Sequence, residues 1–232
     1  MKPFLILPAF LVCLGSAAQI TIKKNTGSYY LPSNSDTLNN ILNISTDGTE
    51  PGPAVGKTIN FFKLYNANND SLDIALELSK GKPIFLFSGS YTCPNYRNEI
   101  KFLDSLEAIY KNKINFFMIY TIEAHPHYPD PSPYTNTLFI PLRNLTDSII
   151  YRQPKTYGQR KLLSETMISR TKSKIPVYID SPSNQWLNNF GTLPNIAYLI
   201  DTSGKVFSKY LSYDRMREEI KRDLKTLSKK KA

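Results

Sequence analysis

Two short apolar runs stand out along the chain, at positions 84–87 and 114–122. Each is almost unbroken, and the first lies between turns rich in glycine, proline and serine, as is typical of a strand buried on both faces. Between the runs, apolar side chains recur at helical spacing from 94 to 110, which predicts a helix that begins at Pro94. A strand, a helix and a strand within about forty residues predict a right-handed crossover with parallel strands.

Weaker patterns on either side complete the order of elements. Before the crossover, alternation at 59–64 indicates a strand and the spacing at 72–78 a short helix. After it, the patterns predict a helix at 159–170, a strand at 177–179, a short helix at 185–190, a hairpin of strands at 196–200 and 205–211, and a closing amphipathic helix at 216–227. This order is that of an α/β protein with a thioredoxin-like fold. We expect a central mixed sheet flanked by helices, with an insertion between the second core strand and the next helix.

Composition divides the chain into three segments. Residues 1–18 combine a positive charge, an apolar stretch too short to cross a bilayer, and small residues at the end, as in a cleavable export signal. Residues 19–54 are polar and predict an extended lead-in, and residues 55–229 form the thioredoxin-like domain. We therefore expect an exported protein, periplasmic or secreted. A lipoprotein anchored through Cys13 is the weaker alternative, because Val12 stands where such a signal has a small residue.

The formal charge is +10, and much of the excess lies at positions 221–231. This basic segment has no interleaved aromatic residues and no recognition motif for nucleic acid. We interpret it as the solvated face of the last helix and its tail. A patch for a membrane surface or nucleic acid is the weaker alternative, so no nucleic acid is expected among the partners.

Cys93 is the one cysteine left after removal of residues 1–18. It follows a buried strand and precedes Pro94, so it lies at a helix amino terminus, where free N–H groups and the helix dipole favour the thiolate. Arg97, one turn on, adds a positive charge. A lone thiol in an exported protein has no partner for an internal disulfide, which favours a reactive cysteine. An inert buried cysteine is the alternative.

The residue three positions after Cys93 is Tyr96, whereas a thioredoxin has a second cysteine there. Dithiol exchange within the chain is therefore disfavoured, and an oxidised Cys93 needs an external thiol reductant. A one-cysteine peroxide reductase is an alternative, because Ser90 lies three residues before the thiol as in peroxiredoxins, although Leu86 replaces their proline. Neither a bound cofactor nor a metal is expected.

Glu123 and His125 directly follow the second buried strand. Loops at the carboxyl ends of adjacent parallel strands share one crevice, so both side chains are expected beside Cys93, with His125 as general acid or base. His127 is a weaker candidate. Pro194 precedes the hairpin, where thioredoxin-like folds commonly place a cis proline that faces the cysteine and binds extended substrate.

Two motifs, Ser-Tyr-Thr-Cys-Pro at 90–94 and Glu-Ala-His-Pro at 123–126, together resemble the active-site segments of the iodothyronine deiodinase family. The similarity continues through 153–160 and 190–201, and it covers nearly the whole domain. Each motif is short, but their joint order and spacing are fairly specific.

The resemblance implies a reductive enzyme on a thioredoxin fold, in which Cys93 takes the position of selenocysteine. It also implies that Ser90 and Thr92 support the nucleophile by hydrogen bonding, and that Glu123 and His125 relay a proton to the leaving carbon. Members of the family tend to form homodimers. The leading hypothesis is thus a thiol-dependent oxidoreductase that acts on a small-molecule or thiol/disulfide substrate.

The sequence departs from the deiodinase pattern at two places. Pro154 stands where animal deiodinases have a second histidine, and Asn195-Ile196 replaces a Glu-Arg pair.

Pro194 and Arg97 are the residues expected to contact the substrate. A non-catalytic module that holds an extended peptide in the thioredoxin crevice is the non-enzymatic alternative.

Overall fold

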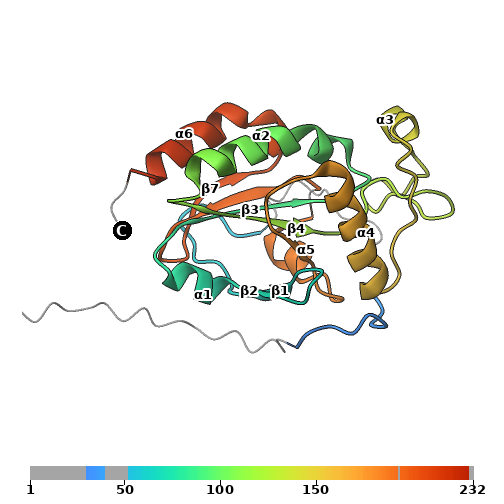
Figure 1. The fold of residues 1–232 in the computed structure, drawn as a ribbon, viewed down its shortest axis with the longest axis horizontal. Helices are drawn as coiled ribbons and strands as arrows, with labels where there is room; N and C mark the ends of the chain where they lie inside the picture. Colours follow the sequence, from blue (N-terminus) through green and yellow to red (C-terminus); the bar gives the residue numbers. More distant parts are fainter. Residues whose placement is uncertain (1–29, 40–51, 193, 230–232) are drawn as a thin grey trace, which may run out of the picture.

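The computed structural model describes residues 30–39, 52–192 and 194–229, which form a seven-stranded mixed sheet with helices on both faces (Figure 1). The predicted export signal and most of the predicted lead-in lie outside these residues. In chain order the elements are β1 (Lys63–Tyr65), β2 (Ser71–Asp73), α1 (Ile74–Ser79), β3 (Ile84–Gly89), α2 (Pro94–Tyr110), β4 (Asn115–Tyr120), α3 (Leu142–Thr146), α4 (Tyr157–Thr171), β5 (Val177–Ile179), α5 (Gln185–Phe190), β6 (Ala197–Ile200), β7 (Val206–Tyr210), a 3₁₀ turn (Tyr213–Arg215) and α6 (Arg217–Leu227).

The strand order is β2-β1-β5-β4-β3-β6-β7. Strands β3, β4 and β5 are parallel, and β1 and β6 join them antiparallel. The predicted crossover is confirmed, because α2 connects β3 to its parallel neighbour β4. The three parallel strands end at the same edge of the sheet, so the loops that follow them gather there.

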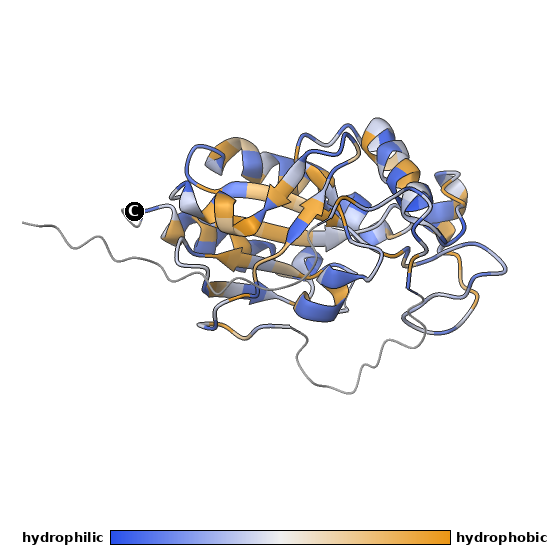
Figure 2. Cartoon of the chain, turned by 90° about the horizontal axis from the view of Figure 1, so that it is seen from below, coloured by the Kyte–Doolittle hydropathy of each residue, from blue (hydrophilic) through white to orange (hydrophobic). Residues whose placement is uncertain are grey.

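Two clusters of buried apolar residues pack against the sheet. In Figure 2 the strands of the sheet are coloured largely as hydrophobic. Successive residues of β3 point to opposite faces, so Phe85 and Phe87 pack under α2, α4 and α6, whereas Ile84 and Leu86 pack with α1 and α5. Burial on both faces is the physical reason for the unbroken apolar runs. On α6, Ile220 is buried and the basic side chains face solvent. This agrees with the interpretation of the basic segment as the solvated face of the last helix.

The region at 59–78 differs from the prediction. Pairing in the first predicted strand starts only at β1, and the predicted helix at 72–78 begins instead with strand β2, with Leu64 opposite Leu72. The chain becomes helical at Ile74, because the Asp73 side chain accepts the N–H of Leu76 and caps α1. Each of these three-residue strands is stabilised by pairing with the other. A hydrophobic period within one segment does not reveal such pairing between segments.

Residues 30–39, here called the strap, also pack on the domain, ahead of the predicted domain start at 55. Leu38 is buried against Tyr157 and Ile179. The N–H of Leu38 donates to the carbonyl of Lys155 at 3.0 Å, and the N–H of Tyr157 donates to the carbonyl of Asp36 at 2.9 Å. The strap therefore belongs to the ordered fold. Across the described ranges, no helix has the length and apolar character needed to span a membrane.

Candidate functional site

Cys93 is the N-cap residue of α2, directly after the turn that follows β3. Its backbone is extended (φ −83°, ψ 108°) and Pro94 opens the helix, as predicted. The thiol is not at the surface: Cys93 is 3 % exposed and belongs to the core cluster under α2. Among the described residues it is a free cysteine with no disulfide.

Burial decides the protonation state of this thiol. It raises the pKa of Cys93 to about 11, although the N–H groups of Tyr96 and Asn95 and the charge of Arg97 lower it. The charge of Glu123 adds to the rise. The helix terminus and Arg97 thus act in the predicted direction, but the expectation of a favoured thiolate is wrong for this structure, because desolvation outweighs them.

The loop after β4 docks onto the turn before α2, as predicted. The N–H of Thr92 donates to the Glu123 carboxylate at 2.7 Å. In return, the N–H of His125 donates to the Thr92 hydroxyl at 3.1 Å, and the N–H of Ala124 donates to the Ser90 hydroxyl at 3.2 Å. Both hydroxyls therefore hold the loop in position. Their hydrogen bonding to the sulfur, which the family resemblance implies, stays a prediction.

Glu123 is fully buried inside this junction. The Tyr120 hydroxyl donates to its second carboxylate oxygen, and the Gln153 side chain pairs with its backbone, accepting the N–H at 2.9 Å and donating to the carbonyl at 3.2 Å. Burial raises the pKa of Glu123, while the hydrogen bonds from Tyr120 and Thr92 oppose the rise. A buried carboxyl with its own hydroxyl donor is suited to holding and passing a proton.

His125 is half-buried at the same edge of the sheet. Its Nδ1 atom is buried and has no hydrogen-bond partner among the described residues, and its ring contacts Phe139 edge-on at 5.7 Å. Burial, and then the charge of Arg97, lower the pKa of His125, so the imidazole is neutral at neutral pH and able to accept a proton. The weaker candidate His127 is exposed.

Arg97 packs against the turn that carries the thiol, and its predicted contact with substrate stays a prediction. Its side chain is 8 % exposed and forms an ion pair with Asp147 at 3.5 Å. It donates to the carbonyl of Tyr91 at 2.6 Å and to the Asn144 side chain at 2.8 Å. Asn144 in turn donates to the carbonyl of Thr92 at 2.9 Å. Helix α3, which no pattern predicted, thus braces the turn that carries the thiol.

Tyr134 is a site residue that the sequence pattern does not single out. It lies on a turn whose Ser132 hydroxyl donates to the carbonyl of Ala124 at 2.8 Å. Its ring packs against the cluster that contains Cys93, and its hydroxyl is buried with no partner in the part of the chain that the structure describes. Burial raises the pKa of Tyr134, and the charges of Cys93 and Glu123 add to the rise. A hydroxyl without a partner among the described residues is available to a reacting atom.

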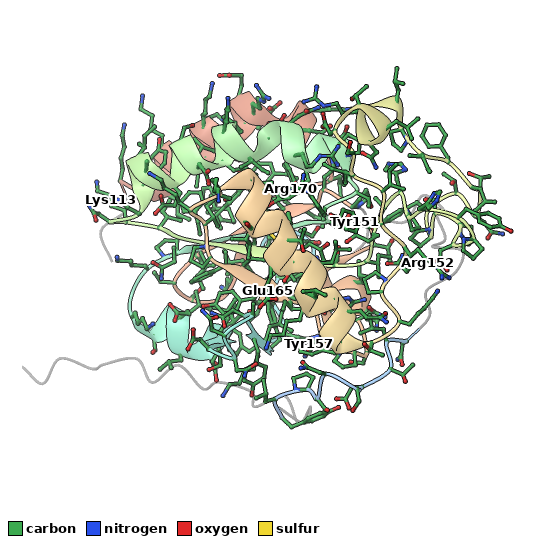
Figure 3. The ribbon with its side chains drawn as sticks, turned by 45° about the vertical axis from the view of Figure 1, so that its right-hand side comes forward. Lys113, Tyr151, Arg152, Tyr157, Glu165 and Arg170 are labelled. Carbon is green, nitrogen blue, oxygen red and sulfur yellow. The ribbon has the colours of Figure 1, made fainter. Side chains whose placement is uncertain are left out.

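The rest of the insertion is held by Asp130 and by a contact between two tyrosine rings. Asp130 accepts from Lys155 at 2.8 Å and from Arg152 at 3.2 Å. Although burial opposes it, these partners lower the pKa of Asp130. The ring of Tyr151 contacts that of Tyr91, two residues before the thiol, with the ring centroids 5.3 Å apart and the planes tilted by 38°. Figure 3 shows Tyr151 and Arg152 in the segment beside α4.

Pro194 lies just before β6, which runs antiparallel to β3. The pairing of Phe87 with Ala197 places the residues before β6 level with the turn after β3, as the fold analogy predicts. The predicted cis bond joins Leu193 to Pro194, and Leu193 lies outside the described residues.

Comparison with known proteins supports the fold. No protein-family model matches the chain, and a search of curated proteins finds no match. A solved thiol:disulfide interchange protein from Bacteroides sp. aligns over 74 % of this chain and 91 % of its own, with 13 % identity and a TM-score of 0.50. Peroxidoxin BcpB from Mycobacterium tuberculosis aligns over 77 % of this chain and 98 % of its own, with 15 % identity and a TM-score of 0.49. The predicted thioredoxin-like fold is confirmed.

Proposed function

We propose that this chain is a thiol-dependent oxidoreductase in which Cys93 is the nucleophile of a reductive reaction. The docking of the Glu123–His125 loop onto the Cys93 turn, through the three hydrogen bonds described above, carries the proposal. A lone thiol, a buried carboxyl and a neutral imidazole meet at the edge where α/β sheets bind ligands. A similar fold in a thiol:disulfide interchange protein is consistent with this chemistry.

The resting thiol is protonated, so the reaction starts with its deprotonation. His125 takes the proton from Cys93 as substrate enters, and the thiolate attacks the electrophilic atom. With a disulfide, the S–S bond breaks, a mixed disulfide with Cys93 forms, and the other sulfur leaves and takes the proton as a thiol. With a hydroperoxide, the O–O bond breaks, Cys93 becomes a sulfenic acid and the leaving oxygen takes the proton. External thiol returns Cys93 to the thiol and is itself oxidised to a disulfide.

The resemblance to deiodinases specifies a third version of this step. The thiolate of Cys93 takes iodine from an aromatic carbon, and that carbon receives a proton through His125 and Glu123. Two equivalents of external thiol then reduce the sulfenyl iodide, which releases iodide and a disulfide. Exported localisation and a homodimer are part of the same proposal.

Access to the thiol requires movement of the insertion, since Cys93 is 3 % exposed. Tyr134 packs against the cluster that holds the thiol, so the turn at 132–137 is the part that we expect to open. When it closes on substrate, the Tyr134 hydroxyl donates to the sulfur or to the leaving atom.

Turnover kinetics test the proposal. We expect thiol-dependent reduction of hydrogen peroxide, of glutathione disulfide or of an iodophenol, with the activity lost in Cys93→Ser. His125→Ala should reduce the rate by roughly 100-fold, as loss of a general base does. His127→Ala is the matched control, because His127 is exposed in the same loop, and it should be fully active. Equal rates for wild type and Cys93→Ser would contradict the proposal.

The burial of Cys93 favours one second candidate, a binding module in which the thiol only fills the core. In that case Cys93→Ser retains partner binding, and no substrate is turned over with any thiol reductant.

A further inference from the structure

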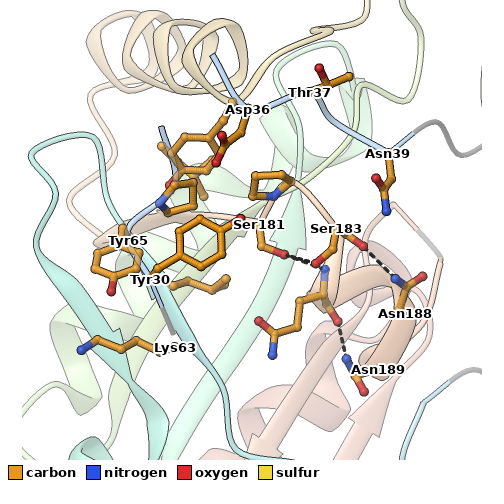
Figure 4. A pocket seen from close by; sticks show the side chains of 16 residues that line it. Tyr30, Asp36, Thr37, Asn39, Lys63, Tyr65, Ser181, Ser183, Asn188 and Asn189 are labelled. Atoms are coloured by element: carbon orange, nitrogen blue, oxygen red, sulfur yellow. Dashed lines mark hydrogen bonds between the residues drawn. The ribbon is translucent and has the colours of Figure 1, made fainter. Parts of the chain in front are cut away.

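A cavity of about 630 Å³ opens beside the strap, at the carboxyl end of β5 (Figure 4). This volume lies within the range of small-molecule sites, roughly 300 to 1,000 Å³. Its walls come from the strap, from β1, and from the loop after β5 with the helix α5. None of the residues placed at the thiol site lines it, so it is separate from the proposed chemistry.

The strap is fixed to the loop after β5 by hydrogen bonds at Asn39. The N–H of Asn39 donates to the carbonyl of Pro182 at 2.8 Å, and the Asn184 side chain donates to the carbonyl of Asn39 at 2.8 Å. Near the start of α4, Gly158 lets the strap approach closely, since a Cβ there would lie 2.8 Å from backbone and side-chain atoms of Asn34. The cavity is therefore preformed.

Helix α5 provides one wall because its two faces differ. Trp186, Leu187 and Phe190 point into the core. Gln185, Asn188 and Asn189 recur at i, i+3 and i+4 on the remaining face and line the cavity. The Asn188 amide donates to the carbonyl of Ser183 at 2.8 Å, and the Asn189 amide donates to that of Gln185 at 2.7 Å. Each carboxamide carries hydrogen-bond donors and an acceptor. The wall therefore matches ligand groups that both donate and accept hydrogen bonds.

Tyrosine rings form the opposite wall. Figure 4 shows Tyr30 and Tyr65 across the cavity from Asn188 and Asn189. Tyr30 is 58 % exposed, so its ring face is open to a ligand. A third lining residue, Tyr157, is 1 % exposed, and its hydroxyl is buried and has no partner within residues 30–39, 52–192 and 194–229.

The charge of the cavity is balanced. Among the described residues that line it, Lys63 and Asp36 are the charged ones, whereas the whole chain carries +10. The cavity therefore lacks the positive excess of the rest of the protein, which disfavours an anionic ligand.

We propose that this cavity binds a neutral saccharide. The C–H face of a sugar ring packs on the exposed ring of Tyr30, and its hydroxyls pair with the carboxamides of α5, because a hydroxyl both donates and accepts. A neutral, hydroxyl-rich ligand also matches the balanced charge of the walls.

Titration with two uncharged trisaccharides, cellotriose and N,N′,N″-triacetylchitotriose, tests this, with calorimetry for affinity and amide NMR shifts for location. We expect at least one to bind with a Kd on the order of 1 mM and to shift signals of α5 and the strap. Tyr30→Ala and Gln185→Ala should each weaken binding about fivefold or more. Tyr128→Ala removes an exposed tyrosine of the insertion and should bind as wild type does.

Cys93→Ser should also bind the sugar normally, so the result is independent of the proposed redox function. Thermal unfolding of each variant separates lost binding from lost folding. No shift with either trisaccharide at roughly 10 mM would overturn the proposal, as would unchanged binding by folded Tyr30→Ala and Gln185→Ala. Binding of an extended proline-rich peptide to the cavity, without sugar binding, would assign it to a peptide instead.

Discussion

The N–H of Thr92 donates to the buried carboxylate of Glu123 at 2.7 Å, and this bond joins the turn before Cys93 to the loop after β4. The same carboxylate accepts from the Tyr120 hydroxyl and raises the pKa of the thiol. A change at Glu123 therefore reaches the nucleophile both through position and through charge.

Glu123→Gln separates these two effects. Glutamine keeps an oxygen for the N–H of Thr92 but removes the charge, so the pKa of Cys93 should fall. Turnover should nevertheless fall at least about tenfold, because the proton-carrying group is lost. Iodoacetamide alkylation against pH gives the first quantity and steady-state rates give the second. A variant that is folded and fully active would remove Glu123 from the mechanism.

Arg97→Met should make the thiol less reactive, since the guanidinium lowers the pKa of Cys93. We expect alkylation at pH 8 to slow by about three- to tenfold, which corresponds to a rise in the pKa of up to about one unit. Arg143→Met is the control, because exposed Arg143 also pairs with Asp147, at 2.7 Å. An equal slowing of alkylation in both variants would show that the altered pairing of Asp147, and not the lost charge of Arg97, makes Cys93 less reactive.

Tyr134→Phe should separate stability from activity. The tyrosine hydroxyl is buried without a partner, so its removal should leave the free energy of unfolding unchanged or raise it by about 1 kcal/mol. Turnover should decrease if the hydroxyl donates to the reacting atoms. Urea unfolding and rates of the same sample test both points, with Tyr128→Phe as control. Lower stability with normal turnover would show that the hydroxyl is structural.

Asp180→Asn should change how stability depends on pH. Burial raises the pKa of Asp180 to about 6, although Arg160 and the N–H groups of Trp186, Leu187 and Ser181 lower it. Because the folded pKa lies above the unfolded value of 3.8, the contribution to stability is full below about pH 4 and is lost as the pH rises through 6.

Between pH 4 and 7, the decrease in the free energy of unfolding that Asp180 causes is on the order of 3 kcal/mol. Urea unfolding of both proteins from pH 4 to 7 should show this decrease in wild type and a smaller one in Asp180→Asn. Parallel pH profiles would contradict the assignment.

The central strands and the helices that cover them follow from the sequence, since burial on both faces or on one stripe leaves a periodic signal. The β1–β2 hairpin and the strap do not, because main-chain pairing with distant segments holds them. Thr37, for example, pairs with Thr156, and polar composition alone predicts only an extended segment.

The candidate site likewise contains residues that the sequence predicts and residues that it does not. Cys93, Glu123 and His125 are predictable, because parallel strands bring their carboxyl ends together. Asn144 is not, since it contacts Thr92 across 52 positions and lies in a short polar helix. The pKa of Cys93 depends on the packing of the whole cluster. Its position at a helix terminus alone predicts a lowered pKa, whereas burial raises it.

The most direct test of Cys93 as a redox nucleophile is intact-protein mass spectrometry after separate exposure to hydrogen peroxide, glutathione disulfide and an iodophenol. Each treated sample is then reduced with dithiothreitol. The account predicts that at least one reagent modifies Cys93 once, that dithiothreitol reverses the adduct, and that Cys93→Ser stays unmodified. A folded wild-type protein whose Cys93 is unchanged by all three reagents would contradict it.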